Sequence, residues 1–176
     1  MKKISLLLLL LLQVTTYSQS ITKLDEKNGF KDFKIGDDFN KWKKDLIYRG
    51  QEGDEKSYTY NGLCCNEIFD FKIDELQLYF IDNKLFKIAI LHINKPNVGD
   101  YISSVNPNKI NYKLMEMFGK FSSKEIDANS GKAFLFWLGR KVELLSVYEY
   151  LGARVGEKFE VLIMKKTDSN SSKEGF

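Results

Sequence analysis

Apolar residues recur at helical spacing in two stretches of the chain, and the first stretch predicts a short amphipathic helix. Phe39, Trp42 and Leu46 stand at positions i, i+3 and i+7, which places them on one side of a helix. An aspartate before Phe39 is suited to cap that helix, and Gly50 is expected to end it. The residues that follow, 51–56, are polar and predict a loop.

The second stretch predicts a helix with start and stop signals at both ends. Asn106 is suited to cap it, Pro107 favours the first helical position, and Gly119 follows the last turn. Four apolar residues at helical spacing form its expected buried stripe: Ile110, Leu114, Met117 and Phe118.

Outside these helices the apolar period changes to two, which is typical of strands. Residues 69–73 alternate between apolar and polar, residues 79–93 predict a hairpin with a tight turn at 82–84, and residues 133–150 predict a second hairpin. Residues 158–165 predict a last strand. Runs of strands without a helix between each pair favour an antiparallel sheet, so we expect an α+β fold with two short helices on one face.

The N-terminal segment has the layout of a secretory signal peptide. Two lysines follow Met1, an apolar run of 11 residues contains seven leucines in a row, and small polar residues lead to Ser18. That run is too short to cross a bilayer, which takes about 20 residues, and no cysteine near it could carry a lipid. We therefore expect residues 1–18 to be cleaved on export to the periplasm or outside the cell, with a cut two residues later as the alternative. Residues 19–166 would then form one domain, and residues 167–176 a flexible tail.

Cleavage changes the charge of the chain, because Lys2 and Lys3 are removed with the leader. The intact chain has a formal charge of +3, and the remaining 158 residues have a charge of +1. A nucleic-acid-binding domain usually carries a strong basic excess, so we expect no nucleic-acid partner. We also expect no membrane-integral segment after cleavage. Thirteen phenylalanines, nine tyrosines and two tryptophans are ample material for a hydrophobic core.

Cys64 and Cys65 are the only cysteines, and they are adjacent. Neighbouring Cα atoms lie about 3.8 Å apart, closer than in ordinary disulfides. Three alternatives stay open: two unremarkable cysteines, a vicinal disulfide, and a bridge between chains. His92 is the only histidine, and a catalytic Cys-His pair would need it beside one of the cysteines, with a third group to orient its ring. The chain has no nucleotide-, phosphate-, zinc- or calcium-binding motif, so we expect no cofactor and no metal.

Four tyrosines stand two residues apart in two pairs, which are Tyr58 with Tyr60 and Tyr148 with Tyr150. On strands, each pair would project to one face of the sheet. Tyrosines on an open face can anchor a protein partner, so these four are the candidate binding residues. The alternative is that they cover the rim of the core and keep their hydroxyl groups in water.

The two halves of the chain contain similar sequence patterns. Residues 80–85 and 137–142 each have an aromatic residue entering a turn and a lysine-aliphatic pair leaving it. This correspondence predicts two tandem helix-plus-hairpin modules, although hairpins of similar composition also arise by chance.

A short capped helix after a Gly-Asp step, then antiparallel strands, then the same order again, resembles the tandem modules of β-lactamase inhibitor proteins. It is also similar to the single-module outer-membrane assembly lipoproteins of the SmpA/OmlA type. The matching segments are 33–46 and 79–90, with 118–120 and 136–137 in the second copy. The chain lacks the lipidated cysteine of those lipoproteins and the disulfides within each inhibitor module. The leader and the composition, rich in Lys, Asn and Phe, resemble small exported proteins of Gram-negative bacteria. The module resemblance implies a binding protein without an active site.

The sequence therefore predicts an exported, non-enzymatic binding protein that uses the open face of its sheet to hold another macromolecule. One alternative is a small periplasmic or secreted hydrolase whose site the sequence does not locate. Another is a structural protein held in the cell envelope by its partners. A deep pocket lined by convergent polar groups would favour the hydrolase, and a flat aromatic face would favour binding. The oligomeric state stays open.

Overall fold

The computed structural model describes residues 22–94, 108–152 and 155–167. The expectations for the leader, for Asn106 and Pro107, and for residues 168–176 lie outside these ranges. The described residues form one eight-stranded antiparallel sheet with the order β3-β4-β7-β8-β12-β11-β10-β9. Its strands are β3 (Leu46–Glu52), β4 (Glu55–Tyr60), β7 (Glu75–Ile81), β8 (Lys84–Asn94), β9 (Ser123–Asp127), β10 (Lys132–Leu138), β11 (Val142–Gly152) and β12 (Gly156–Lys165).

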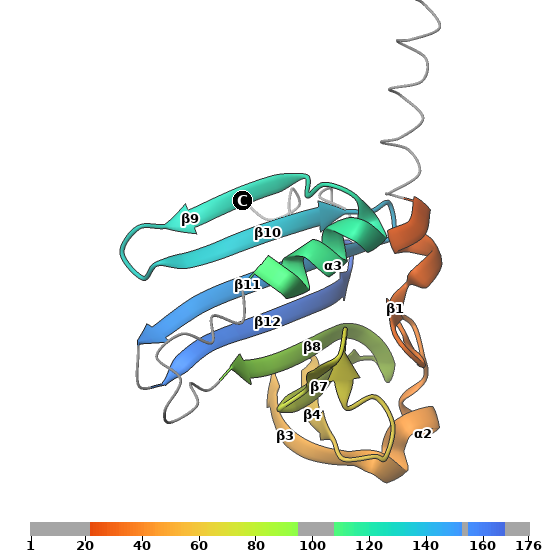
Figure 1. The fold of residues 1–176 in the computed structure, drawn as a ribbon. Coiled ribbons are helices and arrows are strands. Elements are labelled where there is room, and N and C mark those ends of the chain that lie inside the picture. Colours follow the sequence, from red (N-terminus) through yellow and green to blue (C-terminus); the bar gives the residue numbers. More distant parts are fainter. Residues whose placement is uncertain (1–21, 95–107, 153–154, 168–176) are drawn as a thin grey trace, which may run out of the picture.

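Smaller elements accompany the sheet. They are a helix at residues 22–27, the hairpin β1 (Gly29–Phe30) with β2 (Phe33–Lys34), α2 (Phe39–Trp42), a 3₁₀ turn η1 (Lys43–Asp45), the hairpin β5 (Glu67–Ile68) with β6 (Phe71–Lys72), and α3 (Asn108–Phe118). Figure 1 shows α3 in front of the β10–β12 side of the sheet, and the β5–β6 hairpin in front of the β7–β8 side. The predicted antiparallel sheet with few short helices is confirmed.

Each half of the sheet arranges its four strands in chain order from the edge to the centre. From one edge the chain order is β3, β4, β7, β8, and from the other edge it is β9, β10, β11, β12. The last strand of each set pairs with the other in the middle, where β8 and β12 run antiparallel from Lys87 opposite Met164 to Asn94 opposite Glu157. The α2 helix precedes the first set, and α3 precedes the second.

The hydrophobic core lies between the helices and one face of the sheet. Of the four residues in the predicted stripe of α3, Ile110, Leu114 and Phe118 are buried in the core, and Met117 is half-buried against it. Phe39 of α2 packs edge-on against Phe80, with ring centroids 5.3 Å apart. Leu24 anchors the 22–27 helix in the same core. We call this the covered face; no described helix lies on the opposite face.

The first predicted helix is shorter than expected. Asp38 caps α2 by accepting a hydrogen bond from the backbone N–H of Asn40 at 2.9 Å, as predicted, but the α-helix ends at Trp42 and a 3₁₀ turn follows. From Leu46 onward the chain is strand β3 and not helix, and Gly50 lies inside it at a register irregularity. The expected loop at 51–56 is instead the end of a β3–β4 hairpin, in which Gln51 and Glu52 pair with Lys56 and Glu55 and the turn lies at residues 53–54. Strand pairing overrides the helical spacing here, because residues 46–52 gain ladder partners on β4.

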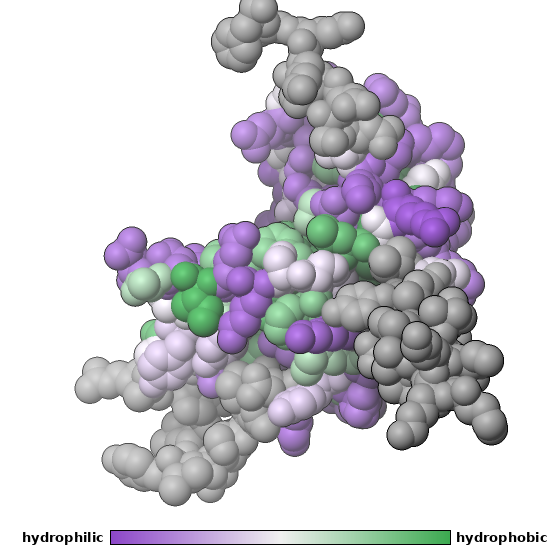
Figure 2. All heavy atoms as spheres, turned by 90° about the horizontal axis from the view of Figure 1, so that it is seen from above, coloured by the Kyte–Doolittle hydropathy of each residue, from purple (hydrophilic) through white to green (hydrophobic). Residues whose placement is uncertain are grey.

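Two other strand predictions need correction. Residues 69–73 are not one strand, because Phe69 and Asp70 take positive φ angles of 49° and 70° and form the turn between β5 and β6. Residues 123–127, for which no strand was predicted, form β9, which pairs with β10 at the sheet edge. The side chains of β9 are exposed or half-buried, which explains why its sequence shows no alternation of apolar and polar residues. Figure 2 shows the molecule from above, which is the side on which β9 lies in Figure 1. On this side green apolar residues lie beside purple polar ones.

The β7–β8 hairpin and the end of α3 agree with prediction, whereas the 22–27 helix and the β1–β2 hairpin were not predicted. The turn between β7 and β8 has Asp82 and Asn83 at φ values of 50° and 60°, as a two-residue hairpin turn requires. Gly119 follows α3 with a φ of 76°, as a helix-ending glycine does. Among the described helices, none has the length and apolar character needed to cross a membrane.

Candidate functional site

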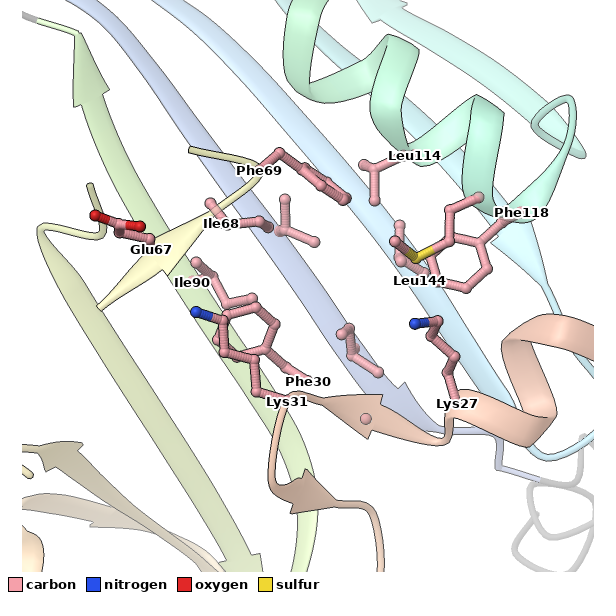
Figure 3. A pocket seen from close by; sticks show the side chains of 14 residues that line it. Lys27, Phe30, Lys31, Glu67, Ile68, Phe69, Ile90, Leu114, Phe118 and Leu144 are labelled. Carbon is pink, nitrogen blue, oxygen red and sulfur yellow. The ribbon is translucent and has the colours of Figure 1, made fainter. Parts of the chain in front are cut away.

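A cavity of about 220 Å³ lies on the covered face, where α3 meets the β5 turn above the central strands (Figure 3). Leu114 and Phe118 of α3 form one wall, and Phe69 comes from the β5–β6 turn. Ile90 and Leu144 belong to the floor of sheet strands. Protein interiors hold few voids larger than a water molecule, so this cavity is a candidate ligand site.

Local sequence explains how these side chains converge. Leu114 and Phe118 stand four residues apart and therefore share one face of α3. Ile90 and Leu144 occupy the inward positions of their alternating strands, with 1% of each side chain exposed. Only Lys27, Lys31 and Glu67 bring charge to the lining.

The opposite face of the sheet carries a second candidate site. One cross-strand row spans all eight strands and contains no charged residue. We call it the uncharged stripe, and from edge to edge its members are Ser123, Phe136, Leu145, Leu162, Ala89, Gln77, Thr59 and Ile47. Strands lie about 4.8 Å apart, so the stripe is roughly 34 Å long.

Charged residues border the stripe. On one side, the neighbouring row holds Glu125, Glu160 and Glu75, and we call these three the acidic flank. Arg49 forms an ion pair with Glu75 at 2.9 Å. Within the described residues, the acidic flank row itself has no lysine or arginine.

Tyr79 lies on the other border of the stripe, and nearby carboxylates change the pKa of its hydroxyl group. Burial raises the pKa of its hydroxyl group, and the negative charges of Glu160, Glu55 and Glu75 raise the pKa further. The ammonium of Lys87 lies 3.9 Å from the centre of the Tyr79 ring and forms an ion pair with Glu55 at 2.9 Å. Lys158 likewise forms an ion pair with Glu160 at 3.4 Å, so the border of the stripe carries both carboxylates and the cations that pair with them.

The adjacent cysteines form a third site, in the loop between β4 and β5. Of the three alternatives, the structure has the vicinal disulfide, and neither cysteine is free. The hydroxyl of Tyr60 lies 3.1 Å from Cys64 Sγ. A carboxylate oxygen of Asp32 and the two sulfur atoms lie within 4.8 Å of one another. Thiolates bind metals and a disulfide does not supply them, so this group could hold an ion only after reduction.

Chemical labelling tests the vicinal bond. We expect the mature protein, denatured without reductant, to react with no thiol-alkylating reagent, and to take up two alkyl groups after reduction. Electrospray mass spectrometry of the intact chain measures both numbers. Two alkylated thiols before reduction, or a covalent dimer that reductant dissolves, would contradict the intramolecular bond.

His92 lies away from thiol chemistry. Its Nδ1 is 2.8 Å from the backbone oxygen of Lys72 and 3.6 Å from a carboxylate oxygen of Asp74, and its ring packs against Phe71. In the described chain no hydrogen bond or ion pair joins it to either cysteine. The predicted Cys-His alternative gains no support from this arrangement.

The candidate tyrosines on β4 lie on the covered face. The Tyr58 ring packs against Phe39 with centroids 5.1 Å apart, and the Tyr60 ring packs against Phe33 at 4.9 Å. Both rings are half-buried in the core rim. This is the position that the rim alternative describes, and a role in binding stays a prediction.

The second tyrosine pair lies on β11, far along the sheet from the first. Tyr148 packs against Phe159 and donates a hydrogen bond to Glu157 at 3.0 Å. Burial, followed by this hydrogen bond and the charge of Glu157, raises the pKa of Tyr148 to about 12. Tyr150 is 56% exposed. The structure therefore does not bring the two pairs together.

Sequence analysis missed both the cavity and the uncharged stripe. Each strand contributes one residue to the stripe, and only the pairing register assembles them. Comparison of the chain with protein-family models, with curated proteins and with solved structures finds no significant match.

Proposed function

We propose that this chain is an exported, non-enzymatic binding protein that holds a protein partner on the uncharged stripe. The observation that carries the proposal is the stripe itself, a row of eight uncharged residues with charged rows beside it. Protein interfaces have the same plan, with charge depleted at the centre and a polar rim. Five of its eight members are apolar, and among the described elements no helix covers this face of the sheet.

The border of the stripe indicates the chemistry of the partner. Because Glu125, Glu160 and Glu75 line one side, a partner with an apolar strip bordered by lysine or arginine would complement it. Such pairs at an interface rim steer association more than they strengthen it. We therefore expect the association rate to fall as salt concentration rises.

The proposal includes the two-module interpretation. The mirrored strand order, with a helix before each set of four strands, supports two tandem modules that join through β8 and β12. The resemblance to β-lactamase inhibitor proteins, which implies binding without catalysis, points in the same direction. The leader supports export. Neither the hydrolase nor the structural alternative is favoured by a contact among the described residues.

Substitution of Ile47 tests the stripe. Ile47 is its outermost member on β3 and is 51% exposed, so Ile47→Glu adds a charge without disturbing the core. A photo-crosslinking residue at Leu145 in the wild-type chain would first identify the partner in an envelope extract. We expect Ile47→Glu to weaken binding of that purified partner at least tenfold, because the new carboxylate would lose its hydration against the apolar strip of the partner. Surface plasmon resonance measures the change.

Tyr112→Glu is the matched control, because Tyr112 is 54% exposed on α3, on the other side of the sheet. It should leave binding unchanged. Equal effects of the two substitutions, or crosslinks from Leu145 only to a second copy of this chain, would defeat the proposal. Sedimentation velocity of the purified protein reports self-association directly.

A further inference from the structure

We propose that the cavity on the covered face binds a single-chain amphipathic anion, with its alkyl chain in the cavity and its acidic head at Lys27 and Lys31. This site goes beyond the proposed protein-binding function, because the cavity and the uncharged stripe lie on opposite faces of the sheet. Either can fail without the other.

The walls of the cavity suit an alkyl chain. Leu114, Met117 and Phe118 come from α3, and Ile90, Leu144 and Val161 come from the central strands. Apolar cavities take apolar ligands, and an enclosed one of about 150 Å³ is already large enough for benzene. The 220 Å³ found here leaves room for a longer, flexible chain. Met117 adds adaptability, since its unbranched side chain fits irregular shapes.

The rim of the cavity suits an acidic head group. Figure 3 shows Lys27 and Lys31 rising from the N-terminal segment on one side of the cavity, with Phe69 and Leu114 across from them. Both lysines are exposed, and within the described residues neither ammonium forms an ion pair. Glu67 lies at the β5 end and points away from the apolar centre. The Lys31 ammonium lies 5.6 Å from the centre of the Phe30 ring. A carboxylate, sulfate or phosphate head could therefore meet two cations that form no ion pair among the described residues, beside an apolar chamber.

Dodecanoate is the probe for this site, used below the concentration at which it forms micelles. We expect isothermal titration calorimetry to show saturable binding of one dodecanoate per chain. Dodecanol, which has the same chain and no charge, should bind more weakly. Acetate, which has the charge and no chain, should not bind.

Two variants separate the head from the chain. The double variant Lys27→Gln, Lys31→Gln removes both charges and should weaken dodecanoate binding about tenfold, with dodecanol binding unchanged. Met117→Trp fills the cavity and should weaken both ligands. Lys43→Gln with Lys44→Gln is the control, because these two exposed lysines lie on η1 and not at the cavity.

Each contrary outcome is specific. Absence of saturable dodecanoate binding to the wild-type chain would overturn the proposal, and so would equal loss in the Lys27/Lys31 and Lys43/Lys44 double variants. Binding to phosphatidylglycerol vesicles without binding to dodecanoate would assign the lysines to a membrane surface and would also overturn it. The lysine variants change exposed residues alone, so they keep the test decisive if Met117→Trp does not fold.

Discussion

Replacement of Phe33 by alanine is expected to lower the free energy of unfolding by about 3–5 kcal/mol. The Phe33 side chain has 0% of its surface exposed. Its ring centroid lies 4.3 Å from that of Trp42 and 4.9 Å from that of Tyr60. Truncation would remove a large buried apolar surface and leave a cavity that these two rings cannot close by small shifts.

The effect is large because Phe33 joins three parts of the fold. It lies on β2, Trp42 lies on α2, and Tyr60 ends β4 beside the Cys64 sulfur. Domains of this size are stable by only about 5–15 kcal/mol, so the variant would approach its unfolding threshold at 37 °C.

Urea denaturation followed by circular dichroism measures the change. Phe33→Leu keeps most of the volume and should cost less than half as much. Tyr112→Ala, at an exposed position, should cost below about 0.5 kcal/mol. If Phe33→Ala shifted the midpoint no further than Tyr112→Ala, the ring would not be the buried link described above.

Local signals predicted those elements whose structure is decided locally. The β7–β8 hairpin was predictable because Asp82 and Asn83 tolerate positive φ. The end of α3 was predictable from Gly119. Val142 and Leu144 stand two residues apart on β11, and both are buried, as the period of a strand favours.

Elements decided by distant partners were not predictable in the same way. The spacing of Phe39, Trp42 and Leu46 suits a helix, but Leu46 pairs with Tyr60 and begins β3 instead. Strand β9 has no apolar alternation and exists because β10 offers it an unpaired edge. In both cases long-range backbone hydrogen bonding decides the conformation.

The candidate sites depend still more on register. Leu145 and Leu162 face each other, and Leu162 faces Ala89, only because β12 pairs between β11 and β8. A shift of one residue in any pair would turn that strand's residues to the other face. The cavity likewise needs Lys27 to lie near Leu114, which is a tertiary relation that no local motif encodes. The adjacency of Cys64 and Cys65, in contrast, could be read directly, and only the choice among bonding alternatives needed the structure.

Asp25→Ala is expected to lower the free energy of unfolding at pH 7 by about 2 kcal/mol, because it removes hydrogen bonds from three backbone donors to a carboxylate. The Asp25 carboxylate accepts hydrogen bonds from the backbone N–H groups of Arg140, Lys141 and Val142, at 2.9, 2.8 and 3.3 Å. These contacts tie the 22–27 helix to the β10–β11 turn more than 110 residues later. The same helix carries Lys27, so the tie also holds one side of the cavity in place.

The loss of stability caused by Asp25→Ala should become smaller as the pH falls. Burial alone would raise the pKa of Asp25, but the three backbone donors and the charge of Lys141 outweigh it, so the pKa is lowered. A carboxyl group whose pKa is lowered by folding stabilises the protein at any pH above its pKa in the unfolded state, which is about 3.9. That stability is lost as the pH falls through the pKa of the folded state. The difference in the free energy of unfolding between wild type and Asp25→Ala should therefore become smaller below about pH 4.

Urea titrations at pH 7 and pH 3 measure this gap, with Glu26→Ala on the same helix as the exposed control. Gly139→Ala offers an independent way to break the contact, because a Cβ there would lie 2.5 Å from Asp25 Oδ1 and 2.6 Å from the backbone oxygen of Val142. If the carboxylate is the tie, Gly139→Ala should cost less in the Asp25→Ala background than in the wild type, since its clash with Asp25 is then gone while its clash with the Val142 oxygen stays. Full additivity, or a gap that stays constant from pH 7 to pH 3, would mean that the N-terminal helix is held by Leu24 packing alone.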